Sequence, residues 1–301
     1  MKLGFMSACL PELSLEELVA WASAQGFGML ELAVWPQGQK ERRYAGTSHV
    51  DVANLTPARA DEIRALFKAH NMQISSLGYY PNYLDPNSEV RDMALSHIKS
   101  VIKAAGMLGV GVVGTFVGRD PKVGVQDTLK EFQALFKPLC RYAADNNVKV
   151  AIENCPMLYP DTWPGGTNVA TSPAIWRQMF DMVPADNLGL NLDPSHLLWQ
   201  WIDAAKCVYE FKDKLFHVHA KDAVVDYQAL HQTGVFGFGW RVDKLAGMGD
   251  VDFKRFIGAL YAVGYNHVIS IEHEDRAFEG TVDKVERGLL LSKQLLEQYI
   301  V

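Results

Sequence analysis

The sequence predicts one α/β domain, a (β/α)₈ TIM barrel that spans residues 1–301. Short apolar runs alternate with longer amphipathic stretches from one end of the chain to the other, which is the order of elements in such a barrel. No linker or shift in composition divides the chain. A doubly wound sheet is the structural alternative, but no GxGxxG or GxxxxGKS/T loop favours a nucleotide-binding fold.

The predicted elements follow from these apolar runs and from the turn residues between them. The first helix begins at a capping box, in which Ser14 is followed three residues later by Glu17. A polar, irregular insertion at 35–55 precedes Thr56 and Pro57, which start the next helix. Further helices are expected at 89–108, 126–146 and 282–299. The eight strands are expected at 3–7, 29–34, 73–77, 111–116, 149–153, 188–192, 215–219 and 267–272.

Composition and charge indicate a globular protein and argue against a nucleic-acid or membrane partner. Hydrophobic residues make up 49% of the chain and charged residues 21%, as in globular proteins. The net charge is -6 and no run is rich in Lys or Arg, which argues against a nucleic-acid partner. No signal peptide and no apolar run of about 18 residues is evident, so no membrane partner is expected. Four scattered cysteines without a CxxC pair indicate reduced thiols, and we expect a cytoplasmic enzyme.

Four consecutive predicted strands end in polar residues that can bind a metal. The active site of a (β/α)₈ barrel lies at the C-terminal ends of its strands. Glu153 ends the fifth strand, Asp193 follows the sixth, His219 ends the seventh and Glu272 ends the eighth. Any one of them alone would more often be a cap, an ion-pair partner or a core histidine. Together they predict a shared site, because only the barrel brings such distant residues together.

The residue types indicate the kind of metal. Three carboxylates and one imidazole suit a hard or borderline divalent ion better than a structural zinc, which favours Cys and His. We expect one ion, Mn²⁺ first, with Mg²⁺, Co²⁺ or Zn²⁺ as alternatives. His217 shares a strand face with His219 and is expected to be structural or to support the ligands. His273 and Glu274 are expected to be structural or loop residues.

The segments AIENCPM, LNLDPSH, HVHAKD and ISIEHED resemble the xylose isomerase-like superfamily of sugar (phosphate) isomerases and epimerases. As a set they are similar to the single-metal site of the D-tagatose 3-epimerase type. The superfamily also contains zinc nucleases with three metals, which use additional histidines after strands three and four. Here those strands end SLGYYPN and GTFVGRD, and the late loop WRVDKLAGMGD lacks an Asp-x-His pair, so three metals are not expected.

The resemblance implies a mechanism and roles for individual residues. An ion that grips two adjacent sugar oxygens would polarise a carbonyl and stabilise an ene-diolate. Glu153 and Glu272 would act as base and acid in turn while binding the metal, and Asp193 and His219 would serve as ligands. The expected substrate contacts are His196, Arg241, Lys221, Trp35 and Trp163, with Tyr79 and Tyr80 as weaker stacking candidates.

The predicted ligand set is compatible with three functions. The first is a metal-dependent isomerase or epimerase acting on a small carbohydrate. The second is a lyase or hydratase on a 3-keto-glycoside, because the same proton abstraction can expel a leaving group. The third is a sugar-binding protein without catalysis. Related barrels form dimers or tetramers, and we expect a homo-oligomer here too.

Overall fold

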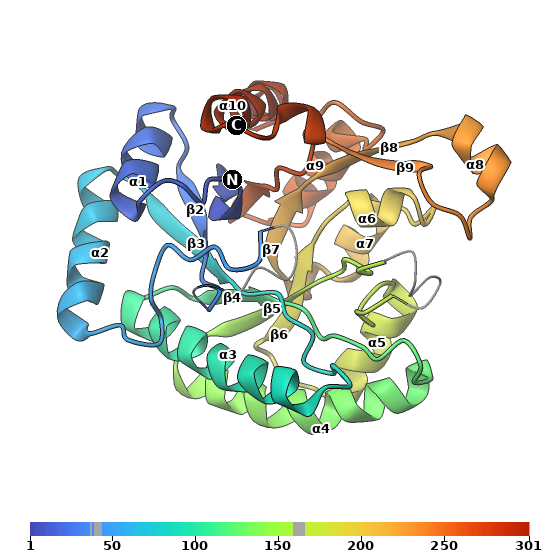
Figure 1. Ribbon diagram of the computed structural model, residues 1–301, viewed down its shortest axis with the longest axis horizontal. Coiled ribbons are helices and arrows are strands. Elements are labelled where there is room, and N and C mark those ends of the chain that lie inside the picture. The colour runs from blue at the N-terminus through green and yellow to red at the C-terminus, as the bar shows by residue number, and fades with distance from the viewer. Residues whose placement is uncertain (37, 39–43, 159–165, 301) are drawn as a thin grey trace.

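Eight parallel strands close into a barrel in this protein, for which a computed structural model describes residues 1–36, 38, 44–158 and 166–300. The strands follow the order β1-β10-β7-β6-β5-β4-β3-β2, and helices surround them (Figure 1). The predicted (β/α)₈ barrel is confirmed, and no barrel strand begins or ends more than one residue from its expected position. The barrel strands are β1 (Lys2–Met6), β2 (Met29–Ala33), β3 (Gln73–Gly78), β4 (Val112–Thr115), β5 (Lys149–Glu153), β6 (Leu188–Leu192), β7 (Leu215–Ala220) and β10 (Val268–Ile271).

The helices begin where the sequence places capping residues. Ser14 accepts a hydrogen bond from the Glu17 amide and Glu17 bonds back to Ser14, so the predicted capping box is present. Thr56 caps the helix that starts at Pro57. The longer helices are α1 (Leu15–Ala24), α2 (Pro57–Ala69), α3 (Ser88–Leu108), α4 (Val125–Asp145), α5 (Pro173–Met182), α9 (Phe253–Ala262) and α10 (Val282–Glu297). Shorter helices are α6 (Ser195–Leu198), α7 (Ala204–Glu210) and α8 (Tyr227–Thr233), with 3-10 turns η1 (Ser7–Cys9), η2 (Lys212–Lys214) and η3 (Arg276–Phe278).

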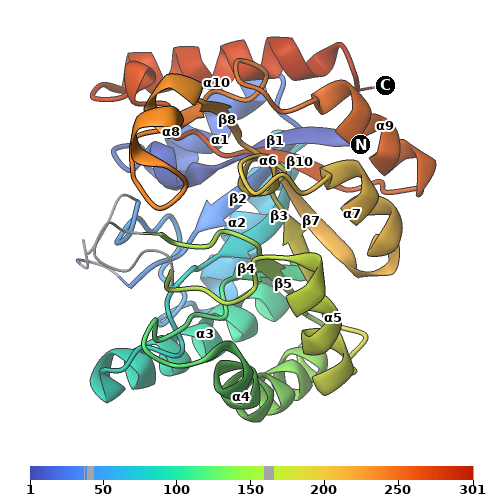
Figure 2. The ribbon, with the colours of Figure 1, turned by 90° about the vertical axis from the view of Figure 1, so that its right-hand side faces the viewer.

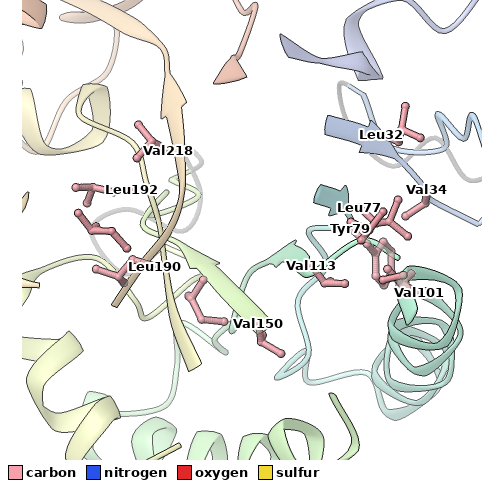
Figure 3. Close-up of a cluster of buried hydrophobic side chains, with 14 of the residues drawn as sticks. Leu32, Val34, Leu77, Tyr79, Val101, Val113, Val150, Leu190, Leu192 and Val218 are labelled. Carbon is pink, nitrogen blue, oxygen red and sulfur yellow. The ribbon is translucent and has the colours of Figure 1, made fainter. Parts of the chain in front are cut away.

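The main hydrophobic core lies between the barrel and its helices. Alternate strand residues point outward into this layer, because successive side chains on a strand face opposite sides. Figure 3 shows Leu190 and Val218 in it on one side of the barrel, and Val113 near Val101 of α3 on the other. The remaining strand positions face the barrel interior, which is partly polar. Burial of the apolar layer therefore fixes which side chains reach the interior.

An antiparallel hairpin was not expected from the sequence. β8 (Asp222–Val225) follows β7 directly and pairs with β9 (Arg241–Lys244), and α8 lies between the two strands. The segment that contains Arg241 is thus strand in part, where the sequence indicated only a glycine-rich loop. In Figures 1 and 2 the hairpin and α8 extend from the end of β7 to the edge of the molecule.

The described part of the 35–55 insertion packs onto the barrel. Ser48 forms an isolated bridge with Val34 at the end of β2. The ring of His49 bonds to Ser7 Oγ at 2.9 Å and to the carbonyl of Leu10 at 3.3 Å. These contacts tie the insertion to the segment after β1. Among the described residues, no helix combines the length and apolarity required to cross a membrane.

Candidate metal centre

The four predicted ligands meet at the C-terminal end of the barrel. Glu153 is the last residue of β5, Asp193 follows β6, His219 lies in β7 and Glu272 follows β10. These strands are neighbours in the barrel, in the order β5-β6-β7-β10. One ligand atom from each residue lies within 4.8 Å of every other. The structure therefore contains a possible metal site at the point the sequence predicted.

Several donor atoms of this group have no hydrogen-bond partner among the described residues. They are Glu153 Oε1, Asp193 Oδ2 and His219 Nδ1, and all three are buried. Buried polar atoms are nearly always paired, so such a cluster requires an explanation. A bound cation supplies one, because carboxylate oxygens and an imidazole nitrogen are its natural ligands. The donor set therefore fits a divalent ion.

Local hydrogen bonding occupies one carboxylate oxygen of Asp193 and leaves the other available to bind a metal ion. Asp193 Oδ1 accepts the Ser195 amide at 2.7 Å, which caps the start of α6. The side chain of Asn154 fixes the backbone of Asp193 through two hydrogen bonds. Its carbonyl oxygen accepts the Asp193 amide at 2.8 Å, and its amide group donates to the Asp193 carbonyl at 2.9 Å. The cap and the ligand functions thus use different oxygens of one carboxylate.

Lys221 lies among the carboxylates of the site. Its ammonium is 2.6 Å from Glu272 Oε2, 3.2 Å from Glu274 and 3.4 Å from Asp193 Oδ2. Burial opposes the charged form, but Glu272, Glu274 and Asp193 outweigh it and raise the pKa of Lys221 well above its usual value. A charged Lys221 therefore offsets part of the negative charge at the site.

The two glutamates differ in their electrostatic surroundings. Burial and the nearby Glu272 carboxylate raise the pKa of Glu153 to about 7. Burial acts in the same direction on Glu272, but Lys221 and His219 hold its pKa well below the usual range. Such a pair, with its pKa values pushed apart, is typical of groups that exchange protons.

Glu31, in the middle of β2, is part of the site although the sequence analysis did not select it. The residue is fully buried, and its Oε2 lies 2.7 Å from His219 Nε2 and 3.2 Å from Ser270 Oγ. Tyr80 donates to the other carboxylate oxygen. Burial opposes ionisation, but His219 and His217 hold the pKa of Glu31 at about 2. An ionised Glu31 accepts a hydrogen bond from Nε2–H of His219, and Nδ1 of the ring faces Glu153 and Glu272.

His217 has the supporting position that the sequence predicted. Its Nδ1 bonds to Asn191 Oδ1 at 3.0 Å and its Nε2 bonds to Ser75 Oγ at 3.1 Å. Asn191 also donates to Tyr80 at 3.0 Å. Burial lowers the pKa of His217 to about 3, so the ring is neutral. This network holds the residues beneath the candidate ligands in one arrangement.

Most predicted substrate contacts surround the same cavity. It has a volume of about 330 Å³, within the range of small-ligand sites. The residues that line it include Trp35, Glu153, His196, Lys221, Arg241, Glu272 and Glu274. His196 Nε2 is 3.5 Å from both Glu153 Oε1 and Asp193 Oδ2. Trp163 lies outside the described residues.

Tyr80 lines this cavity as well, whereas Tyr79 lines an adjacent cavity and packs edge-on against Trp35. Glu274 lies in the loop after β10, as the sequence predicted, and it also contacts Lys221 and lines the cavity. His273 is buried, and a side chain at Gly288 of α10 would collide with it. The strand alternation thus sends His273 toward the helices, as expected.

A family model described as a xylose isomerase-like TIM barrel matches residues 19–295. The chain belongs to this family. One relative, uncharacterized protein YfiH of Bacillus subtilis, is 22% identical over an alignment of 339 residues that covers 100% of this chain and 99% of YfiH.

Solved structures with the same fold include several sugar enzymes. D-psicose 3-epimerase of Clostridium cellulolyticum H10, solved with D-tagatose, has a TM-score of 0.74 at 14% identity, covering 100% of this chain and 99% of that one. An IOLI protein with a bound zinc atom has a TM-score of 0.73 at 18% identity, covering 100% and 99%. The 3-keto-D-glucoside 4-epimerase YcjR of E. coli has a TM-score of 0.71 at 16% identity, covering 99% of each chain. At these identities the likeness concerns the fold.

Proposed function

We propose that this protein is a divalent-metal-dependent sugar isomerase or epimerase that abstracts a proton next to a carbonyl. The observation that carries the proposal is the convergence of Glu153, Asp193, His219 and Glu272, three of which present a buried donor atom without a hydrogen-bond partner among the described residues. Membership in the xylose isomerase-like family and likeness to sugar epimerases support the same class of reaction.

The ligand set supplies the chemistry of such a reaction. A divalent ion held there, which we expect to be Mn²⁺, would act as a Lewis acid on a substrate carbonyl and acidify the neighbouring C–H. Glu153 and Glu272 come from β5 and β10, with β6 and β7 between them, so their carboxylates approach the substrate from different sides. One takes the proton and the other returns a proton to the planar carbon.

The remaining residues hold the groups that react. Asp193 and His219 serve as ligands, and Glu31 keeps His219 in the required tautomer. His196 is placed to contact a substrate oxygen, since its ring borders both the cavity and the carboxylates. Lys221 balances the carboxylates and stabilises negative charge that develops on the substrate.

The proposed substrate is a small carbohydrate, without a nucleic acid or a membrane as partner. A cavity of about 330 Å³ with Trp35 and Tyr80 in its wall has the size and the aromatic surface that suit one sugar ring. We propose further that residues 1–301 form one domain and that the protein assembles as a dimer or tetramer.

The proposal is tested by solvent exchange. The Mn²⁺-loaded protein is incubated in D₂O with a panel of ketoses and keto-glycosides, and NMR follows deuterium uptake beside the carbonyl. Exchange is expected for at least one substrate, and Glu153→Gln should abolish it. Glu16→Gln, at an exposed position on α1, serves as the matched control and should leave exchange unchanged. No exchange across the panel, or full exchange in Glu153→Gln, would refute the assignment.

A lyase acting on a 3-keto-glycoside is the second candidate. Proton abstraction by the same glutamate would there expel a group from the next carbon, and likeness to a 3-keto-glucoside epimerase favours keto-glycosides as substrates. The NMR experiment separates the two reactions, because a lyase releases the leaving group whereas an epimerase returns the intact glycoside.

A further inference from the structure

A second cavity lies beside the one that faces the candidate ligands. Its volume is about 510 Å³, and residues after four successive barrel strands line it. Arg119 follows β4, Asn168 follows β5, Trp201 follows β6 and Trp240 belongs to the insertion after β7. The cavity therefore opens on the catalytic end of the barrel, where loops carry substrate-binding residues.

Four aromatic side chains are among the residues that line this cavity, which we call the aromatic pocket. Trp201 is stacked on Trp240, with ring centroids 6.4 Å apart and planes 19° from parallel. Trp199 meets Trp240 edge-on at 6.1 Å. Phe236, from the insertion between β8 and β9, lines the same pocket and is 71% exposed. Flat apolar surfaces of this kind bind other rings by stacking.

Trp201 is held at the surface in an unfavourable backbone conformation. Its φ is 54°, in the left-handed region that bulky residues rarely adopt, and its side chain is 61% exposed. This conformation closes the α6 turn, because the Ile202 amide donates to the Leu197 carbonyl and the Trp201 amide donates to the Leu198 carbonyl. The turn accounts for the backbone but not for the exposed ring, which a bound ring would cover.

The aromatic pocket adjoins the candidate active site. Pro156 and Leu158 line both cavities. Arg241, which lines the cavity of the candidate ligands, places its guanidinium over the ring of Trp199 at 4.4 Å. The two cavities are therefore neighbours, and a molecule that passes Pro156 and Leu158 would contact both.

We propose that the aromatic pocket is a second subsite, which binds the outer ring of a glycoside whose reacting sugar lies at the metal centre. The substrate class is then a glycoside with an aryl or sugar ring attached, rather than a free monosaccharide. This inference rests on the proposed function for the reacting sugar, but the binding of the outer ring depends on Trp201 and Phe236 and is measured separately.

Calorimetric titration tests the subsite on the full-length protein, with Mn²⁺ and again with EDTA. The probes are para-nitrophenyl β-glucoside, cellobiose and methyl β-glucoside. The probes with an outer ring should bind about tenfold more tightly than the methyl glucoside, as expected for stacking on several rings. Trp201→Ala and Phe236→Ala should each reduce this preference at least about threefold. Tyr209→Ala, at a similarly exposed aromatic position on α7, should leave it unchanged.

The outcomes separate this inference from the proposed function. Equal binding of all three probes, or a preference that survives both variants, would overturn the subsite. So would sedimentation showing that Trp201→Ala dissociates an oligomer without altering glycoside binding, because a second copy would then cover the pocket. A preserved preference for ringed probes without any deuterium exchange would support the subsite and refute the proposed reaction.

Discussion

Glu31 is a buried carboxylate that supports His219, one of the candidate ligands, through the ring nitrogen that faces away from Glu153 and Glu272. Glu31 lies 2.7 Å from His219 Nε2 and accepts further bonds from Tyr80 and Ser270. Its charge favours a proton on Nε2 of His219, and Nδ1 faces the carboxylates of Glu153 and Glu272. Partners of this kind raise the basicity of a ligating histidine and hold its ring in place.

Replacing this partner should weaken metal binding. Glu31→Gln removes the charge but retains the shape, so we expect the affinity for Mn²⁺ to fall by about 10- to 100-fold. Calorimetric titration of the protein, after metal removal with EDTA, measures the affinity directly. Glu16→Gln provides the control at an exposed site. If Glu31→Gln bound Mn²⁺ as tightly as the unaltered chain, the supporting role of Glu31 would be wrong.

The candidate ligands could be predicted from sequence, whereas Glu31 could not. Glu153, Asp193 and Glu272 stand at strand ends, a position that barrel geometry makes informative. Glu31 stands in the middle of MLELA, where nothing in the sequence indicates its partners. The available signal was the lone charge within an apolar strand, because a fully buried carboxylate requires a partner. Its identity depends on strand neighbours that only the folded barrel defines.

At the scale of elements, Asp222 organises the connection between β7 and α9. Its carboxylate accepts backbone amides from Ala223, Gly247, Gly249 and Val251. The residue is buried at the start of β8, three positions after His219. The loop after β9 is thereby attached to the start of β8, directly after the strand that carries His219.

Disrupting this attachment should destabilise the protein. Asp222→Asn places an amide group where the carboxylate accepted N–H bonds, so we expect the free energy of unfolding to fall by about 2 kcal/mol. Urea denaturation measures the loss, and hydrogen exchange at Gly247 and Gly249 should accelerate. Asp213→Asn, on the exposed turn η2, is the matched control. A variant with unchanged stability and exchange would show that these bonds contribute little.

The barrel strands were predictable because each is an apolar run between turn residues. The β8–β9 hairpin was not, for a physical reason. The RVDK segment of β9 is only partly buried and carries no apolar alternation. Its pairing with DAVV depends on a contact across the α8 insertion, and no local pattern reports that contact. Arg241, a predicted substrate contact, lines the cavity but lies in β9 and not on the loop that the sequence indicated.

At the scale of the whole molecule, buried neutral histidines make stability depend on pH. Burial lowers the pKa of His49 and His97, which lie near the end of β2, and of His267, which precedes β10. Each histidine takes up a proton more readily in the unfolded chain, whose pKa is near 6.5. Their contribution to stability is therefore full above that pH and declines as the pH falls below it.

This dependence can be measured at His49. The free energy of unfolding is determined in EDTA between pH 5 and pH 8 for the unaltered chain and for His49→Gln. The difference between them should shrink below about pH 6.5, by up to about 1.4 kcal/mol per pH unit. Comparing the two proteins cancels other titrating groups, including Glu153. A difference that did not vary with pH would mean that folding leaves the pKa of His49 unchanged.

The candidate ligands occupy four adjacent strands, β5, β6, β7 and β10, and leave β1 to β4 without one. The loops after the ligand-free strands still border the reaction cavity, for example at Trp35 and Tyr80. In the proposed enzyme, all four metal ligands come from the second half of the chain, whereas Trp35 and Tyr80 of the first half belong to the cavity wall. Substitutions at these two wall positions would alter the shape of the cavity while every candidate ligand is retained, a separation that lets the specificity of a barrel change without loss of its metal site.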